Sequence, residues 1–397
     1  MSLIWLVVST MLLMACDKGD DSLSPSLAYL NYESVSCEET INKIITEGSS
    51  SVKYTATIVA GDDWCSFDIK SKVLVREAKA SNAAFLYFSR NTSDEPRSAQ
   101  IEVEFSDGST FSLEMVQGQY SASAKYDHKW AELPVHQAKP QYIYKTYFVD
   151  VYSGTSTYKT MRNYTICYDT DKTISHWVAY PVHECYIKGG KRTNAWSYDP
   201  NDQQPVIPTS EQQYILKSYN TGHARGHILP SATRLNSYNS EVNEQTFYAT
   251  NMMPQHYEFN GGVWASLEGK VRENMGKNDG SRDTLYVVTG THFADNKTVS
   301  DRMGTRIAVP SHAYKVLLRA RNPLPAGKTI ADLSADELIA IGFWFENSDV
   351  GENTTIREAA CTVNEIEERT GFTFFGNLSQ EAASVKGRYS LSDWSGF

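Results

Sequence analysis

The stretch RGHILPSATRLNSYNSEVNEQTFYATNMMPQHYEFNGGVWASLEGKVR, residues 225–272, decides the fold of this chain. It begins with Arg225-Gly226-His227, and near its end four side chains recur at every fourth position: Asn260, Trp264, Glu268 and Arg272. Four residues advance about 400° around an α-helix, so such a stripe drifts only about 40° per step. The spacing therefore predicts a helix that carries an amide, an indole, a carboxylate and a guanidinium on one side, with a histidine facing it from another segment.

These residue types suit the cleavage of a phosphodiester. A neutral histidine can deprotonate water near neutral pH. A hard divalent cation takes oxygen ligands, and Mg²⁺ keeps several waters, so one amide oxygen and an outer carboxylate are chemically sufficient. Arginine clamps phosphate through its planar fork. The stretch supplies each part, with His227 as base, Asn260 as ligand, Glu268 for the waters, and Arg225 and Arg272 for phosphate.

Four motifs, in this order and spacing, resemble the signature of a known family. They are Arg225-Gly226-His227, Asn251 with Pro254-Gln255, Asn260-Gly261-Gly262-Val263-Trp264, and Leu267-Glu268. The family is that of the DNA/RNA non-specific endonucleases, which have the ββα-metal, or His-Me finger, fold. The likeness extends over most of residues 140–378. It implies an α+β nuclease domain, which we expect over residues 141–397.

The resemblance also implies a reaction, in which a His-activated water hydrolyses phosphodiester bonds of DNA and RNA in a metal-dependent, sugar-non-specific endonuclease. The resemblance implies that His227 is the general base, that Asn260 is the sole direct protein ligand of Mg²⁺ (or Mn²⁺), and that Glu268 orients water on the metal. It further implies that Arg192 stabilises the pentacovalent phosphorane and that Arg225 and Arg272 hold substrate phosphate. Asn251 and Gln255 would support the site.

Several alternatives stay open at this point. Ala224 stands where the family signature has Asp, and the competing interpretation is a surface glycan-binding lipoprotein whose nuclease domain is degenerate. Arg272 could instead pair with Glu268 at helical spacing, and Trp264 fits core packing better than base stacking. Many members of the family pair, so both a monomer and a homodimer are compatible with the resemblance.

A small β-sandwich is predicted ahead of this domain, over residues 27–118. Apolar and polar residues alternate over 51–58, 84–88, 99–105 and 111–116, with a turn signal at Asp107-Gly108. Asp63-Trp64, Asn91, Arg97-Ser98-Ala99 and the end Val116-Gln117 resemble the Ig-like BACON domains of Bacteroidetes proteins. That resemblance implies a glycan or mucin binder, and the other interpretation is a spacer.

The N-terminus resembles a bacterial lipoprotein signal. An uncharged apolar run over residues 2–15, too short to span a bilayer, ends at Cys16 and is followed by a polar tether over residues 16–26. We therefore expect residues 1–15 to be a signal peptide and Cys16 to be lipidated. The expected location is the outer membrane of a Gram-negative bacterium, to which the lipid would anchor the exported protein.

Charge and cysteines set further bounds. The net charge of −10 argues against a simple basic nucleic-acid binder, but residues 17–120 hold 17 acidic and 9 basic residues, which leaves 121–397 almost neutral. The six cysteines include no CxxC motif, which argues against a zinc site. Export would permit a disulfide between Cys37 and Cys65.

Further elements are expected in the nuclease domain, after a linker over residues 119–140. Strands are predicted over residues 143–151, 162–168, 175–182, 284–290, 306–309 and 313–319. Helices are predicted over 334–341, capped by Ser334, and over 363–370, ended by Gly371. Arg192 falls in the loop Lys191-Arg192-Thr193-Asn194-Ala195-Trp196.

Overall fold

The computed structural model describes residues 26–35, 41–48, 51–67, 71–78, 84–89, 91, 93, 95–118, 130–137, 139–152, 158–200, 205–219, 222–325 and 327–397. The predicted signal peptide, the lipidation site Cys16, nearly all of the tether, Cys37 and most of the linker lie outside these residues. Within them, no helix combines the length and the apolar character that crossing a bilayer requires. The chain folds as two compact units, the first made chiefly of strands up to Val116 and the second chiefly of residues 117–397.

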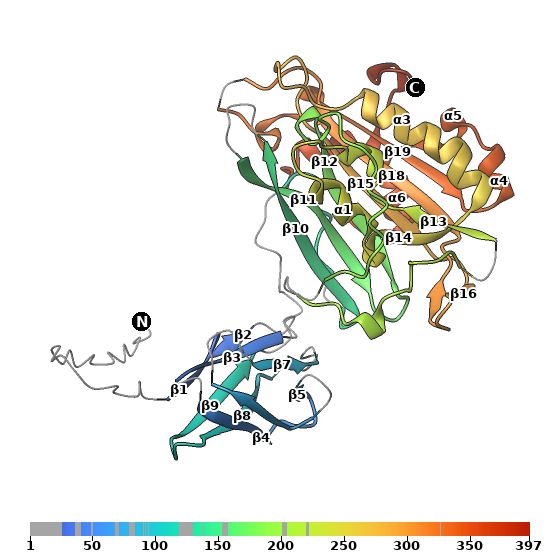
Figure 1. The fold of residues 1–397 in the computed structure, drawn as a ribbon. Helices are drawn as coiled ribbons and strands as arrows, with labels where there is room; N and C mark the ends of the chain where they lie inside the picture. Colours follow the sequence, from blue (N-terminus) through green and yellow to red (C-terminus); the bar gives the residue numbers. More distant parts are fainter. Residues whose placement is uncertain are drawn as a thin grey trace. The chain divides into compact units, whose positions relative to one another are not determined.

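The first unit contains two β-sheets (Figure 1). One sheet has the order β1 (Leu27–Leu30), β3 (Ile41–Glu47), β7 (Ala84–Phe88), β5 (Cys65–Phe67), and the other has the order β2 (Ser34–Val35), β9 (Thr110–Gln117), β8 (Arg97–Phe105), β4 (Lys53–Ala60), β6 (Val73–Glu77). The four predicted strands are confirmed as β4, β7, β8 and β9. Gly108 adopts φ 92° in the turn between β8 and β9. The assignment of these sheets to an Ig-like, BACON-like sandwich stays a prediction.

A seven-stranded antiparallel sheet forms the centre of the second unit. Its order is β10 (Tyr142–Tyr152), β11 (Tyr158–Asp169), β12 (Ile174–Val182), β15 (Leu285–His292), β18 (His312–Ala320), β19 (Leu338–Glu346), β20 (Ala360–Cys361). All nine residues of β12 are buried, because the sheet is covered on both faces. The strands predicted in this domain are confirmed, with ends that differ by up to four residues.

A ββα unit covers one face of this sheet. The antiparallel pair β13 (His223–His227) and β14 (Met252–His256) leads into a helical run of α2 (Tyr257–Phe259), η7 (Asn260–Trp264) and α3 (Ala265–Glu273). Trp264, Leu267 and Val271 of this run pack into the core with residues of β15, β18 and β19, and Figure 1 shows α3 lying over these strands. The predicted helix is therefore confirmed, and Trp264 is a core residue.

The start of this helix departs from the even spacing that the sequence suggested. Residues Asn260–Trp264 form a π-helical turn, and Gly262 has non-helical angles (φ −97°, ψ −111°). Residues spaced four apart lie on the same side of the helix only in its α-helical part, from Ala265 onward. Trp264 consequently faces the core, while Asn260, Glu268 and Arg272 stay partly exposed.

The other face of the sheet is covered by α6 (Val363–Thr370) and the C-terminal segments. Gly371 ends α6 at φ 73°, as predicted. The helix predicted over residues 334–341 is wrong. Ser334 and Glu337 do form a capping box, but it closes only one 3₁₀ turn, Ala335–Glu337, before β19 begins. The apolar run after Glu337 pairs along its whole length with β18, and this pairing outweighs the local helix signal.

The remaining elements are short. They are α1 (Glu241–Glu244), α4 (Asp349–Asn353), α5 (Ile356–Ala359), β16 (Thr298–Ser300), β17 (Arg306–Ala308), and the 3₁₀ turns η2 (Glu184–Tyr186), η3 (Thr209–Glu211), η4 (Ser231–Arg234), η5 (Gln245–Phe247), η6 (Ala249–Asn251), η8 (Ile330–Asp332), η10 (Ala382–Gly387) and η11 (Leu391–Asp393). Several of these turns lie between β13 and β14, where they carry the chain around the candidate site.

Candidate functional site

His227 ends β13 and is buried against aromatic rings. The ring centroid of Phe247 is 4.8 Å away, that of Trp196 is 5.5 Å away, and Nε2 has no hydrogen-bond partner among the described residues. Burial, together with the nearby charges of Arg192 and Arg225, lowers the pKa of His227 to about 3. The imidazole is therefore neutral at physiological pH and has a nitrogen free to accept a proton.

Asn251 fixes the chain that follows His227. Its amide nitrogen donates to the backbone oxygens of Leu229 (3.0 Å) and Thr246 (2.7 Å), and its side-chain oxygen accepts from the backbone N–H of Leu229 (2.8 Å). The backbone oxygen of Asn251 also accepts from the N–H of Ile228 at 2.9 Å. Because Asn251 itself is fully buried, these bonds hold the end of β13 in one position.

Gln255 lies on β14, the strand that pairs with β13. It is fully buried opposite Ala224 in the β13–β14 pair, and neither atom of its amide group has a partner within the described chain. A Cβ on Gly226 would lie 2.2 Å from Gln255 Oε1, so only glycine fits at that position. The side chain that could reach this amide from the facing strand is the one at residue 224, where the family Asp is replaced by Ala.

Two arginines flank His227. Arg192 donates from Nε to Asn194 (2.9 Å) and from Nη1 to Ser231 (2.7 Å), and its guanidinium carbon lies 4.7 Å from the centre of the Phe247 ring. Arg225 donates to the backbone oxygen of Ile215 at 2.5 Å. Among the described residues neither guanidinium pairs with a carboxylate, and partial burial lowers both pKa values. Two guanidinium groups without an ion-paired carboxylate in the described chain therefore lie beside a neutral imidazole.

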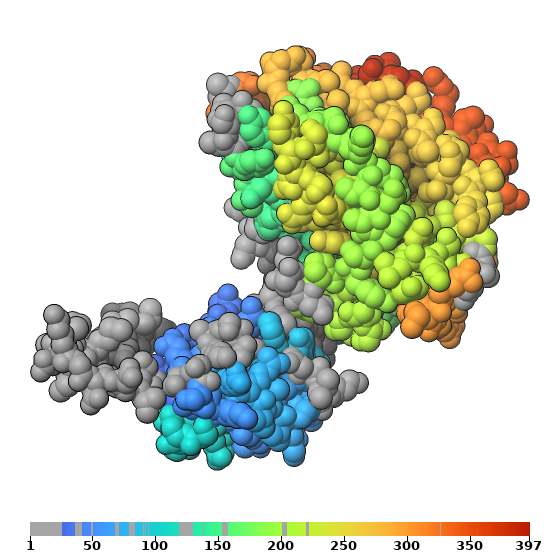
Figure 2. Space-filling view, viewed as in Figure 1, coloured from blue at the N-terminus to red at the C-terminus, as the bar shows by residue number. Residues whose placement is uncertain are grey.

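Glu268 and Arg272 lie on successive turns of α3, which Figure 2 shows in gold along the surface. Loss of solvent around the Glu268 carboxyl raises its pKa, and the charges of Lys315, Arg272 and Arg192 oppose this shift. Arg272 acts on Glu268 through its charge, and no ion pair within 4.0 Å joins them in the described chain. The alternative that they form an ordinary salt bridge is thereby not supported.

Asn260 begins the π turn of the same helical run. Its side chain is half-buried and makes no hydrogen bond with any described residue, so its amide oxygen is available to a ligand. The described residues also hold no group of three or more His, Cys, Asp or Glu side chains that could bind a metal. An amide oxygen with a carboxylate two turns away is chemically suited to a hard cation that keeps most of its waters.

The sequence-predicted residues therefore converge. Mutual electrostatic effects join His227, Arg192, Arg225, Glu268 and Arg272 into one site. Asn260 belongs to the helical run that carries Glu268. Asn251, in η6, and Gln255, in β14, are both fully buried.

Sequence reasoning missed Lys315 on β18. It is completely buried, donates to Thr289 Oγ1 at 2.9 Å and lies 4.3 Å from the centre of the Trp264 ring. Burial lowers its pKa, which the neighbouring carboxylate of Glu268 counteracts. The signal that could have revealed it is a lysine between Tyr314 and the apolar run Val316–Leu318 in the strand HAYKVLLRA.

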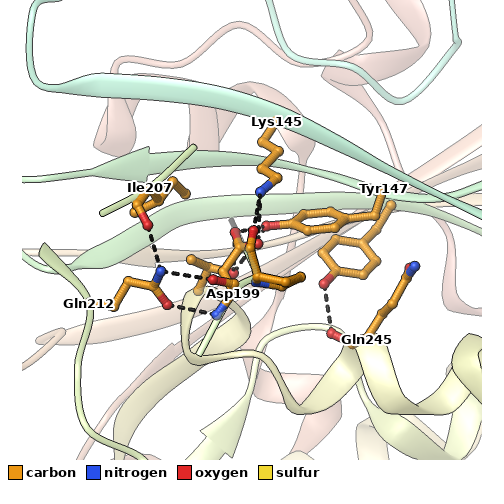
Figure 3. A network of polar contacts seen from close by, with 9 residues as sticks. Lys145, Tyr147, Asp199, Ile207, Gln212 and Gln245 are labelled. Carbon is orange, nitrogen blue, oxygen red and sulfur yellow. Dashed lines mark hydrogen bonds and ion pairs between the residues drawn. The ribbon is translucent and has the colours of Figure 1, made fainter. Parts of the chain in front are cut away.

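Asp199 is the second omission, and Figure 3 shows the network around it. Its carboxylate pairs with Lys145 Nζ at 2.7 Å and accepts from the hydroxyl of Tyr147, while its backbone N–H donates to Gln212 at 2.7 Å. Thr250, next to Asn251, donates to the same carboxylate at 3.5 Å. Burial raises the pKa of Asp199, and Lys145 opposes this effect. The network joins β10 to the loop that carries Arg192 and to the turn that carries Asn251.

Comparisons with known proteins agree with this arrangement. Residues 145–381 match the family model described as DNA/RNA non-specific endonuclease. The chain is 29% identical to the mitochondrial nuclease EXOG of Danio rerio over 230 residues, which cover 56% of this chain and 62% of that protein. It is 28% identical to a nuclease of Nostoc sp. over 220 residues (54% and 72%), and 27% identical to the nuclease of Serratia marcescens over 239 residues (59% and 82%).

The chain spans about three fifths of the length of the mitochondrial EXOG nucleases that it matches. The family model nevertheless covers more than half of the chain, including the whole of the ββα unit. This protein therefore belongs to the DNA/RNA non-specific endonuclease family.

Proposed function

We propose that this protein is a metal-dependent endonuclease that hydrolyses the phosphodiester bonds of DNA and RNA. The observation that carries the proposal is the buried, neutral His227 between two arginines that have no carboxylate partner in the described chain. A general base must be unprotonated, and a phosphodiester needs positive charge around its oxygens. Relatives named as nucleases support the same reaction class.

The charge of each side chain determines its role in the proposed reaction. The imidazole of His227, which its low pKa keeps unprotonated at physiological pH, accepts a proton from the attacking water. Arg225 and Arg272 hold the substrate phosphate, and Arg192 stabilises the extra negative charge on phosphorus in the transition state. The Glu268 carboxylate accepts hydrogen bonds from water and so orients it. Each contribution requires the side chain to be fixed before the substrate binds.

Asn260 would hold the divalent cation, Mg²⁺ or Mn²⁺, with Glu268 on the same helix as the outer carboxylate. When bound, the cation supplies charge neutralisation at the phosphate and at the leaving oxygen. The free amide of Asn260 and the absence of a larger ligand cluster among the described residues fit such a site. Low sequence preference follows, because contacts to phosphate do not distinguish bases.

Cleavage of plasmid DNA and of a structured RNA, in Mg²⁺ and in EDTA, tests the proposal. Wild type should cleave both only in Mg²⁺, and His227→Ala should lower the rate by about 10²- to 10⁴-fold. His292→Ala is the matched control, because His292 packs against Trp344 at a distance from the site residues. Folded wild-type protein without metal-dependent cleavage would instead favour the degenerate domain, in which Ala224 is the first defect.

A further inference from the structure

Trp196 lies beside Arg225, Arg192 and His227. The guanidinium carbon of Arg225 is 3.8 Å from the centre of its indole ring, and that of Arg192 is 5.9 Å away. The His227 ring centre is 5.5 Å from the indole on another side. The Trp196 side chain thus contacts or approaches Arg225 and Arg192, which would bind phosphate, and His227, which would accept the proton.

The contact with Arg225 is the closest arginine–aromatic contact among the described residues. Arg225 has a single hydrogen bond there, from Nη1 to the backbone oxygen of Ile215, and no carboxylate holds the rest of its fork. One hydrogen bond leaves a guanidinium free to rotate, whereas a ring face in van der Waals contact fixes its plane. The plane in which Arg225 meets a phosphate is therefore set by Trp196.

The loop around Trp196 is itself held on both sides. The Trp196 N–H donates to the backbone oxygen of Asn194 at 2.9 Å, and Ser197 O accepts from the N–H of Ala249 at 2.9 Å. Three residues after the indole, the Asp199–Lys145 pair ties the loop to β10 (Figure 3). These contacts fix the backbone that carries the indole.

We propose that Trp196 is a positioning residue for substrate binding: its indole face holds the Arg225 guanidinium in the plane that meets phosphate. This inference rests on the proposed function, since it assumes that Arg225 meets a phosphate of a nucleic acid. The ring attracts the guanidinium through its quadrupole, so a side chain of similar bulk without a π face cannot replace it. Packing alone would tolerate such a replacement.

The test compares Trp196→Phe, which keeps a π face, with Trp196→Met, which keeps only apolar bulk. Binding of a fluorescein-labelled single-stranded oligonucleotide is measured in EDTA by fluorescence anisotropy over a range of salt concentrations. Trp196→Met should bind about five-fold more weakly and lower the salt slope by about one, as loss of one phosphate contact does. Trp196→Phe should stay within about two-fold of wild type.

A double-mutant cycle with Arg225→Met provides the second readout. Once Arg225 is gone, Trp196→Met should cause no further loss, because the indole acts through that guanidinium. In Mg²⁺, Trp196→Met should raise KM by more than it lowers kcat. Trp344→Met, on the opposite face of the sheet, is the control for loss of an indole, and near-ultraviolet circular dichroism verifies the fold of each variant.

Three results would overturn the inference: Trp196→Met binding as tightly as wild type, Phe and Met variants losing affinity equally, or losses that add in the cycle. The EDTA measurement does not depend on cleavage. Wild-type protein that binds but does not cleave would contradict the proposed function alone, whereas folded wild type that does not bind the oligonucleotide would overturn both.

Discussion

Replacing Lys145 by Met removes the counter-charge of a buried carboxylate. Lys145 Nζ and Asp199 Oδ1 are 2.7 Å apart, and both side chains are fully buried. After the replacement, Asp199 keeps the hydroxyl of Tyr147 as a donor but has no cation. Methionine has nearly the same length as lysine, so the change removes the charge with little loss of volume.

The expected cost at neutral pH is about 3 kcal/mol of unfolding free energy. Removing one partner of a buried ion pair typically costs roughly 3 to 5 kcal/mol, because the other charge stays uncompensated. The hydrogen bond from Tyr147 places this case at the lower end. Adding Asp199→Asn removes the orphaned charge, and the double variant should regain more than half of the loss.

The stability deficit of Lys145→Met should change with pH, in a direction that follows from the pKa of Asp199. Burial already raises the pKa of Asp199 in the wild type, while Lys145 opposes that shift. Without Lys145 the folded-state pKa rises further above the unfolded value of about 3.9. A raised carboxyl pKa means that stability is kept at low pH and lost as pH rises through the folded value. The deficit of the variant should therefore be larger at pH 8 than at pH 5.

Urea unfolding followed by near-ultraviolet circular dichroism at these two pH values measures the deficit. Lys159→Met, at an exposed position of β11, is the matched control and should change the unfolding free energy by less than about 0.5 kcal/mol. A deficit below about 1 kcal/mol at pH 8, or one equal at both pH values, would refute the reasoning about an uncompensated buried charge.

Three further predictions concern the site itself. On acidification kcat/KM should fall with an apparent pKa above the usual carboxyl range, since catalysis needs an ionised Glu268, whose pKa is raised, whereas His227 stays neutral down to about pH 3. A profile governed by a pKa in the usual carboxyl range, about 4.3 for glutamate, would contradict this assignment. Asn251→Ala removes three buried hydrogen bonds and should cost about 3 kcal/mol in urea unfolding, with a parallel loss of cleavage; a neutral effect would show that the clamp is dispensable. Ala224→Asp should give the unpartnered amide of Gln255 an acceptor and raise stability by about 1 kcal/mol, and a destabilised variant would show that no room exists for the carboxylate.

Much of the site was predictable because its residues lie close together in sequence. The spacing from Asn260 to Glu268 predicted the helix, and the sequence around His227 predicted a histidine that faces it from another segment. The π turn at Asn260–Trp264 was not predictable, since it depends on the non-helical angles of Gly262 and on the burial of Trp264. A helix prediction from the spacing of residues assumes regular α-helical geometry along the whole segment.

Residues that act through tertiary contacts were not predictable for another reason. Lys145, Lys315 and Asp199 are single charges in unremarkable segments, and only folding brings each one to its partner. Trp196 likewise meets Arg225 across 29 residues of sequence. The failure over residues 334–341 has the same origin, because a satisfied capping box cannot compete with a neighbouring strand that pairs nine residues.

The most direct measurement is an anomalous difference map from a crystal soaked in Mn²⁺. The account predicts one strong peak about 2.1 Å from the side-chain oxygen of Asn260, with no other side chain of the protein as a direct ligand and with His227 facing it across the site. A peak held by other side chains, or none near Asn260 in protein that cleaves DNA in Mn²⁺, would contradict it.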